Sequence, residues 1–248
     1  MIRAVIIDDE RNSRDIISLM LGKYCPEIEA VGMAANCREG IEQIRMHQPQ
    51  LVFLDLEMPD GTGFDVLAGA YDASFEAIFV TAFEKRFLHT IRLSEVELIL
   101  KPIDKESLLQ AVGTVVERMG RERLHDRYEV LLRNFGKPAA EVRQLVLPAP
   151  AGPEEIVAVE DILFLESQAD KTLFYLADGR ELPSARTFRY YTELFAQMRF
   201  YQVNNTQMVQ VHQIGDIDED GNRVQIAQHS IEVTGRRMRE LVNLWRQH

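Results

Sequence analysis

Up to Ile103, short apolar runs alternate with segments of helical periodicity. The apolar runs are rich in β-branched residues and have the length of strands buried on both faces, which is typical of a parallel sheet. Strict alternation of such runs with helices predicts a doubly wound α/β domain. Asn36, with Glu39 three residues later, and Asp104 are expected to cap two of the helices. The predicted strands cover residues 2–7, 28–33, 51–54, 77–80 and 97–100.

A long apolar stripe follows the fifth predicted strand. Its spacing is close to that of a coiled coil with one stutter, and its flanks are charged. Because Gly113 and Gly120 disfavour a helix interior, two interpretations stay open: one continuous helix, or a domain-closing helix followed by a linker helix. In either form we expect the stripe, the fourth and fifth helices, or both to support a homodimer. The stripe consists of Leu108, Val112, Val115, Met119, Leu124, Tyr128, Leu131 and Phe135.

From Val142 the periodicity changes to that of strands. Asp178-Gly179 and Asp220-Gly221 each lie between β-like runs and predict hairpins. Helices are predicted over 186–197, where three aromatic residues share a core-facing side, and over 236–245. The expected organisation is an α/β domain over 1–120, a helical linker over 121–137, and a mainly antiparallel β domain over 138–248.

Composition and charge narrow the class of protein. The chain of 248 residues has room for two domains, and 46% of its residues are hydrophobic. No apolar segment approaches the roughly 20 residues of a membrane span, and the chain runs straight into a strand, which argues against a signal peptide. Cys25 and Cys37 have no metal or redox spacing, which fits a reducing cytoplasm. We therefore expect a cytoplasmic protein that does not bind membranes.

The net charge of −11 is unevenly distributed along the sequence. Residues 1–120 carry −8, residues 121–137 carry +2, and residues 138–248 carry −5. An acidic second half is unfavourable for binding nucleic acid, because neutralisation of phosphates supplies much of the affinity.

Polar residues stand at the ends of four predicted strands. Asp8 and Asp9 end the first, Asp55 ends the third, Thr81 follows the fourth, and Lys101 follows the fifth. In an open α/β sheet, chemistry collects beyond the carboxyl ends of the strands. Three carboxylates brought together there predict a hard, oxygen-lined cation site with one acid left over to react.

This acid pair, Asp, Thr and Lys-Pro, in that order, resembles the receiver domain of two-component response regulators. The resemblance implies a flavodoxin-like strand order 2-1-3-4-5 and a phosphoryl group transferred from a sensor histidine kinase to Asp55, the nucleophile. It also implies Mg²⁺, with Asp9 as a direct ligand, Asp8 as a ligand through water, the backbone carbonyl of Glu57 as a third contact, and Asp55 in the same site.

The receiver resemblance gives roles to two further residues and exposes one departure. Lys101 would pair with a phosphate oxygen, and Thr81 would donate a hydrogen bond to another. Receivers usually carry an aromatic residue three positions before the lysine, where this chain has Leu98. Phosphatases of the haloacid dehalogenase class need a second Asp where this chain has Glu57, and a Walker-type glycine-rich loop is absent. A regulator is therefore expected, not an enzyme.

The second half is similar to the LytTR DNA-binding domain, a mostly antiparallel β family that reads DNA through loops. The family's usual basic pair before a Ser is Asn204-Asn205 before Thr206 here, and one Arg of its last segment is Gly235. Its segments in this chain are residues 162–166, the hairpin at Asp178-Gly179, residues 200–206 and residues 231–237.

The predicted contacts with duplex DNA are loop residues. Asn can bond an adenine edge and Arg a guanine or a phosphate. The alternative is that Asn204-Asn205 only builds a turn and that the arginines form a solvated helix start. The sequence thus predicts a phosphorylation-controlled transcription regulator; the competing hypothesis is a signalling protein whose degenerate C-terminal domain binds protein. The candidate contacts are Lys171, Asn205, Arg236 and Arg237.

Overall fold

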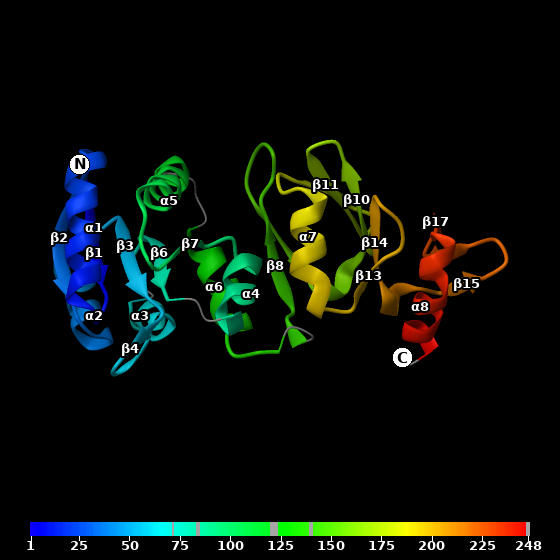
Figure 1. Ribbon diagram of the computed structural model, residues 1–248, viewed down its shortest axis with the longest axis horizontal. Helices are drawn as coiled ribbons and strands as arrows, with labels where there is room; N and C mark the ends of the chain where they lie inside the picture. Colours follow the sequence, from blue (N-terminus) through cyan, green and yellow to red (C-terminus); the bar gives the residue numbers. More distant parts are fainter. Residues whose placement is uncertain (71, 83–84, 120–123, 139–140, 247–248) are drawn as a thin grey trace. The chain divides into compact units, whose positions relative to one another are not determined.

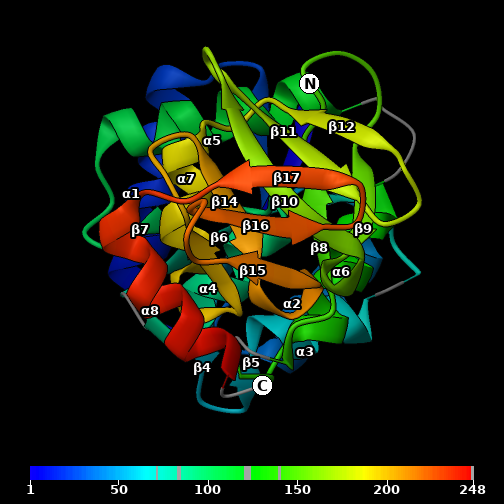
Figure 2. The same ribbon diagram turned by 90° about the vertical axis from the view of Figure 1, so that its right-hand side faces the viewer.

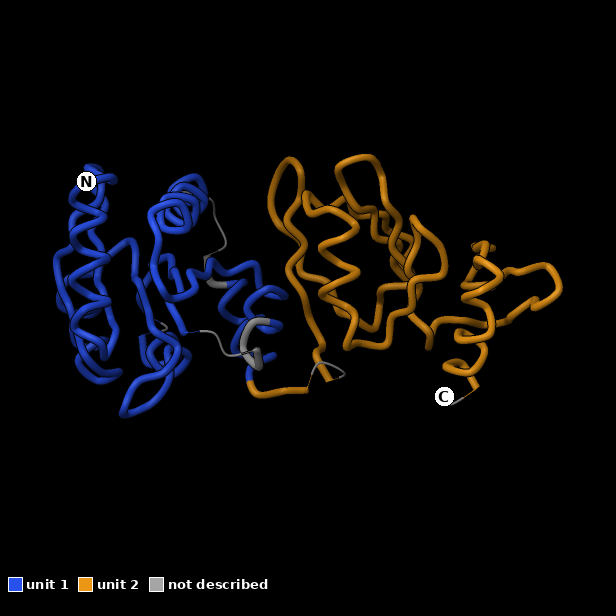
Figure 3. The backbone as a smooth tube through the Cα atoms, in the orientation of Figure 1, with its two compact units in different colours: residues 1–135 blue, residues 136–248 orange. Residues whose placement is uncertain are grey.

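The computed structural model describes the chain except residues 71, 83–84, 120–123, 139–140 and 247–248. The chain folds into two compact units, Met1–Phe135 and Gly136–His248 (Figure 3). The division falls at the predicted end of the apolar stripe, beside Gly136, whose φ of +74° suits glycine.

A parallel sheet of five strands, in the order β2-β1-β3-β6-β7, forms the centre of the first unit (Figure 1). Each predicted strand is present, and the pairing of β1 with both β2 and β3 is parallel. Buried apolar side chains occupy both faces, as expected for a sheet covered on two sides. The strands are β1 (Ile2–Ile7), β2 (Ile28–Ala34), β3 (Leu51–Asp55), β6 (Glu76–Thr81) and β7 (Glu97–Leu100), and a small hairpin is formed by β4 (Glu57–Met58) and β5 (Gly61–Thr62).

Helices cover both faces of this sheet. Alternate strand residues point to opposite faces, so Ile6 packs against α1 and α5 while Ile7 packs against the other layer. The predicted caps are present: Asn36 accepts from the Glu39 amide, and Asp104 from the Ser107 amide. The helices are α1 (Arg11–Tyr24) and α5 (Lys105–Arg118) on one face, and α2 (Cys37–His47), α3 (Gly63–Gly69) and α4 (Lys85–Leu93) on the other.

The apolar stripe belongs to two helices. Helix α5 ends at Arg118, and Met119 leaves the helical conformation with φ −57° and ψ 125°. Residues 120–123 lie outside the described part of the chain, and α6 (Leu124–Asn134) follows. Helix α5 buries its part of the stripe on one face of the sheet, and α6 buries Tyr128 and Leu131 in the core of the other. Of the two interpretations, the structure shows two helices and not one continuous helix, and the first unit itself covers the buried side chains of the stripe, Leu108, Val112, Val115, Tyr128 and Leu131.

The second unit is built on a five-stranded antiparallel sheet in the order β12-β11-β10-β14-β13. The Asp178-Gly179 turn joins β11 to β12, and Asp220-Gly221 lies between β15 and β16, as predicted. Its strands are β8 (Gln144–Leu147), β9 (Glu155–Ala158), β10 (Ile162–Gln168), β11 (Lys171–Leu176), β12 (Glu181–Ser184), β13 (Phe200–Gln202), β14 (Gln207–Gln210), β15 (Asp216–Asp218), β16 (Arg223–Ile226) and β17 (His229–Glu232).

Two helices complete the second unit (Figure 2). Helix α7 (Phe188–Leu194) is shorter than predicted, because its last residues form the 3-10 turn Phe195–Gln197. Its aromatic residues are core, as predicted: Tyr191 is 1% exposed, and its hydroxyl lies 2.6 Å from the Ser184 hydroxyl. Helix α8 (Gly235–Arg246) packs its apolar side on strands β14 to β17. Further 3-10 turns cover Val159–Asp161 and Val211–Gln213.

Candidate functional site

An acidic pocket lies at the carboxyl ends of β1 and β3, with a lysine facing it. The Lys101 Nζ atom is 2.8 Å from Asp55 Oδ2, 3.0 Å from Asp8 Oδ2 and 2.7 Å from Glu10 Oε1. Asp8 and Asp55 are 1% and 5% exposed, so two acids and a cation share a largely dry site. The sheet order brings together residues nearly fifty positions apart, as strand-end placement predicted.

Burial sets the protonation of this pocket. It raises the pKa of Asp8 to about 6, although the hydrogen bond from Lys101 opposes the shift and the Asp55 charge adds to it. Burial raises the pKa of Asp55 as well, against the hydrogen bond and charge of Lys101. Burial opposes the charged form of Lys101, but its hydrogen bonds to Asp55, Glu10 and Asp8 outweigh that cost and raise its pKa. The pocket therefore holds more negative charge than its single cation stabilises.

The donor set suits a hard divalent cation. Asp8, Asp9, Glu10 and Asp55 each offer an oxygen, and these oxygens lie within 4.8 Å of one another. Asp8 Oδ2 is buried and, among the described residues, receives no aligned hydrogen bond despite its 3.0 Å approach to Lys101 Nζ. A buried carboxylate oxygen without a donor is costly unless a cation takes that place. Carboxylates with water and a phosphate oxygen are the usual ligands of Mg²⁺.

The other predicted residues of this site lie close by. Thr81 ends β6 and is 3% exposed, and its carbonyl accepts a 2.7 Å hydrogen bond from the Lys101 amide. The Glu57 amide donates to Asp55 Oδ1 at 3.3 Å, which places the Glu57 backbone beside the Asp55 carboxylate. Asp9 is exposed at the rim. Sequence reasoning missed Glu10, although a third acid directly after an acid pair was a visible signal.

The loop after Asp55 is held in place by neighbouring elements. Asp60 accepts hydrogen bonds from the amides of Cys37 and Arg38, at 2.8 and 3.1 Å, at the start of α2. A Cβ added to Gly63 would lie 2.5 Å from the Asp55 carbonyl oxygen, so only glycine permits α3 to begin this close to Asp55. Asp55 is thereby in direct contact with the start of α3.

In the second unit, the sheet brings two candidate contacts to one end. Lys171 pairs with Gln168 at the tip of the β10–β11 hairpin. Strand β10 also pairs with β14, and the Ser167 amide donates to the Thr206 carbonyl at 2.8 Å. The hairpin tip and the loop containing Asn205 therefore project from the same end of the sheet. Lys171 and Asn205 are both exposed.

The start of α8 joins this end. The Thr234 amide donates to the Val203 carbonyl at 2.9 Å, directly before the loop that carries Asn205. Arg236, in the first turn of α8, is exposed. Lys171, Asn205 and Arg236 thus come from three separate segments to one edge of the unit, which we call the loop face.

Arg237 has a different place. Its Nη1 donates to the carbonyls of Gln202 and Asn204, at 2.8 and 3.0 Å, and the residue is half-buried. The Asn204 side chain accepts from the amides of Thr206 and Gln207. Asn204 therefore builds a turn, and Arg237 holds the backbone of that turn against α8. Two backbone carbonyls thus engage Nη1 of Arg237, which gives the residue a structural role, and its contact with DNA stays a prediction.

An acidic turn borders the loop face. The Val233 amide donates to the Asn222 carbonyl at 2.8 Å, so the β15–β16 turn lies beside the start of α8. Glu219 in this turn pairs with Arg246 at 3.2 Å, and Asp218 accepts from the Gly221 amide. The turn thus brings acidic residues beside the start of α8, in keeping with the acidic balance of the second half, although Glu219 itself pairs with the last residue of that helix.

Two family models match separate parts of the chain. The response regulator receiver domain matches residues 4–113, and the LytTr DNA-binding domain matches residues 155–246. The receiver match contains the acidic pocket, and the LytTr match contains the loop face. Within the described residues, no helix combines the length and apolar character needed to cross a membrane.

Relatives of both parts are known. An uncharacterized response regulatory protein of Vibrio cholerae is 25% identical over 88% of this chain and 87% of that protein. The sensory transduction protein LytT of Bacillus anthracis is 26% identical over 66% of this chain and 65% of that protein. Another Vibrio cholerae response regulatory protein is 33% identical, but the match spans only 48% of this chain and 50% of that protein. Among solved structures, the response regulator domain of Thermotoga maritima CheB aligns with a TM-score of 0.44 at 22% identity, over 50% of this chain and 99% of that one.

Proposed function

The chain is a response regulator that joins a receiver domain to a LytTR DNA-binding domain, and from this we propose that phosphorylation of Asp55 controls its binding to promoter DNA. The observation that carries the proposal is the pocket itself: a buried carboxylate at a strand end, 2.8 Å from a lysine ammonium, beside a second buried acid, one oxygen of which receives no aligned hydrogen bond among the described residues. The packing of the sheet and its helices does not by itself require two buried acids and a lysine at these strand ends.

The chemistry is phosphoryl transfer to a carboxylate. An oxygen of Asp55 attacks the phosphorus carried by a histidine of a sensor kinase; the new O–P bond forms as the N–P bond breaks, and the electron pair returns to the histidine nitrogen. Bound Mg²⁺, held by Asp8, Asp9, Asp55 and the Glu57 carbonyl, would neutralise charge on the incoming group. Lys101 supplies a second positive charge within reach of the phosphoryl oxygens. The Thr81 hydroxyl would donate to one of those oxygens once they are present.

The proposed output is binding of duplex DNA by the loop face. Asn205 and Arg236 are exposed and able to reach base edges, and Lys171 is suited to a phosphate. We propose a homodimer on paired sites, with α4 and α5 as the contact between copies, since the apolar stripe is covered. We also propose a cytoplasmic location, where the protein would meet both the kinase's phosphohistidine and the promoter.

One observation favours a second candidate function for the C-terminal domain. The domain carries net −5 and an acidic turn next to the loop face, and one family arginine is replaced by Gly235. Such a surface also suits a protein partner with basic groups. Selection of full-length protein, with beryllofluoride and Mg²⁺ at low salt, against a random duplex pool separates the two: enrichment of a sequence supports DNA binding, and no enrichment favours the protein partner.

The proposed phospho-acceptor is tested with acetyl phosphate and Mg²⁺. Mass spectrometry is expected to show one phosphoryl group on the wild-type chain and none on Asp55→Asn. Asp15→Asn, on the exposed side of α1, is the matched control and should be labelled like the wild type. A fully labelled Asp55→Asn variant would refute the assignment. Light scattering with and without beryllofluoride tests the homodimer, and a strictly monomeric protein in both conditions would exclude it.

A further inference from the structure

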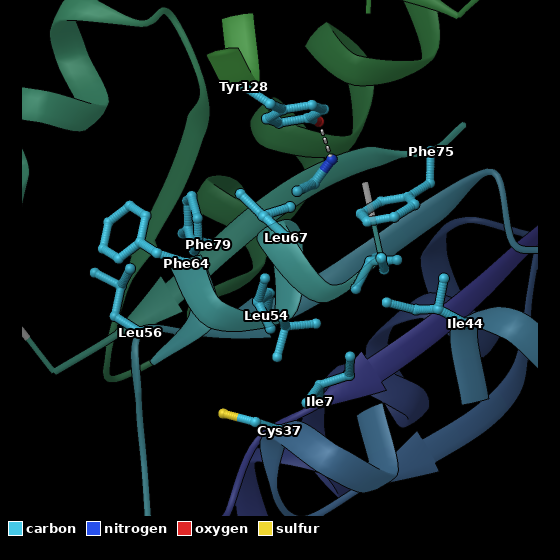
Figure 4. Packing of buried hydrophobic residues seen from close by; sticks show 14 of the residues in the cluster. Ile7, Cys37, Ile44, Leu54, Leu56, Phe64, Leu67, Phe75, Phe79 and Tyr128 are labelled. Carbon is cyan, nitrogen blue, oxygen red and sulfur yellow. Dashed lines mark hydrogen bonds between the residues drawn. The ribbon is translucent and has the colours of Figure 1, made fainter. Parts of the chain in front are cut away.

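Helix α6 packs into the core of the receiver unit. Tyr128, Val130 and Leu131 are buried, and Phe135 packs at the edge of the same cluster. Figure 4 shows Tyr128 above the strand, with Phe64, Phe79 and Leu67 in the same cluster. The sequence after the receiver match thus completes the receiver core, although residues 114–135 lie beyond the match at 4–113.

Tyr128 bonds to the sheet itself. Its hydroxyl accepts a 2.6 Å hydrogen bond from the Ala77 amide and donates at 3.3 Å to Glu76. Pairing of β6 with β7 begins only at Ile78, one residue further along. In the part of the chain that the structure describes, the Ala77 amide has no strand partner on the β7 side, and Tyr128 takes that position. A buried amide left without an acceptor is costly, so this bond ties α6 to β6 specifically.

A continuous set of contacts leads from α6 to the phospho-acceptor. The Phe135 ring lies 4.1 Å from that of Phe64, which lies 5.3 Å from that of Phe79. Phe64 is the second residue of α3, and the residue before it, Gly63, has no space for a Cβ against the Asp55 carbonyl. Phe79 is two residues before Thr81 on β6. Both responding parts of the site, Asp55 and Thr81, therefore adjoin the aromatic residues on which α6 rests.

We propose that α6 is the output element of the receiver: it is docked while Asp55 is unmodified, and phosphorylation weakens its docking. This inference rests on the proposed phosphorylation of Asp55. Close-packed aromatic clusters respond to a shift of one member by changing arrangement, since they have little room to deform. Leu98 stands where receivers usually have a switching aromatic residue, and the Phe64–Phe135 contact offers another route for the signal. The chain continues from Phe135 directly into Gly136, the first residue of the second unit.

Hydrogen exchange on the full-length chain tests the proposal, with and without Mg²⁺ and beryllofluoride. Amides of residues 127–134 are expected to lose protection by roughly tenfold or more when the ligand binds, because docking limits their opening. Tyr128→Phe keeps the ring but removes the bond to Ala77, so its α6 should already exchange faster without ligand. Arg133→Gln, on the exposed side of the same helix, is the matched control and should behave like the wild type.

Hydrogen exchange in the loop over residues 55–63 distinguishes a failure of the proposed role of α6 from a failure of the proposed phosphorylation site. If the ligand changes exchange in this loop, and Asp55→Asn abolishes the change, the proposed site is supported. Suppose that, under those conditions, the ligand leaves the protection of residues 127–134 unchanged in the wild type and in Tyr128→Phe. The proposed role of α6 would then be overturned, while the proposed phosphorylation site would stand. If the loop itself does not respond to the ligand, or responds equally in Asp55→Asn, the proposed phosphorylation site fails and the inference falls with it.

Discussion

At the scale of single residues, the excess of negative charge in the acidic pocket affects the free energy of unfolding. Burial raises the pKa of Asp8 from 3.8 to about 6. Between these two values the folded chain binds more protons than the unfolded chain at Asp8. The free energy of unfolding contributed by this group is therefore highest at low pH and falls as pH rises through the window from about 4 to 6.

Replacing Asp8 by Asn should remove this penalty. Without Mg²⁺ at pH 7.5, we expect Asp8→Asn to raise the free energy of unfolding by about 1–3 kcal/mol and to flatten its decline between pH 4 and 6. Mg²⁺ should stabilise the wild type more than the variant, because ions that bind only the folded chain add stability by mass action. Urea unfolding across pH measures both effects. A variant less stable than the wild type at pH 7.5 without Mg²⁺ would contradict the prediction.

Neighbouring arginines at the start of α8 should differ in what they affect. Arg237→Ala removes two hydrogen bonds to the Asn204 turn, and we expect it to lower the free energy of unfolding by roughly 1–3 kcal/mol. Arg236→Ala should leave stability unchanged and weaken specific DNA binding by about 1–3 kcal/mol. Thermal unfolding and fluorescence anisotropy on the selected duplex separate the two, with exposed Arg239→Ala as a control. Equal effects of both substitutions on stability would argue against this assignment.

At the scale of elements, α6 shows how a local pattern can mislead. Periodicity identifies an apolar face but not the surface that covers it. The spacing from Leu108 to Phe135 resembles a coiled-coil seam, yet its two parts pack on opposite faces of one sheet. The reason lies in β6 and β7, whose pairing leaves the Ala77 amide for Tyr128.

The Tyr128 hydrogen bond should be measurable in stability. Tyr128→Phe leaves the packing of the ring in place but removes the acceptor of a buried amide, so we expect a loss of about 1–3 kcal/mol in the free energy of unfolding. Urea denaturation of the full-length chain provides the measurement, and Tyr24→Phe on α1 offers a half-buried comparison. A loss below about 0.5 kcal/mol would indicate that water replaces the hydroxyl.

At the scale of the whole molecule, the first unit ends at Phe135 and not at residue 120, where we expected the boundary. We propose residues 1–135 as the folding unit of the receiver. A fragment of residues 1–120 would lose Tyr128, Leu131 and Phe135 and uncover the aromatic cluster beneath α6. It should be less stable than the 1–135 fragment by roughly 2–4 kcal/mol and should self-associate through the uncovered face. Urea unfolding and light scattering of the two fragments test this; equal stability and two monomers would refute it.

The strand positions, the strand-end residues and the hairpins were predictable from the chain. A strand buried on both faces must be apolar along its length, and residues that follow parallel strands must meet at one edge, so the sequence alone predicts that Asp8, Asp55 and Lys101 lie together. The turn at Asp178-Gly179 was equally accessible, because Gly179 has a φ of +86°, a backbone conformation that selects glycine. In the turn at Asp220-Gly221 the residue with positive φ is Asn222, at +52°.

Three features depended on tertiary structure. Glu10 reaches Lys101 only because its side chain turns away from capping α1, and Arg237 serves the Asn204 turn only because α8 begins beside the end of β13. The position of α6 was determined by the Ala77 amide, to which Tyr128 bonds, and by an aromatic cluster assembled from α3 and β6. Local sequence determines which side chains seek burial or a partner, whereas the partner comes from segments far along the chain and is set only when the sheet is complete.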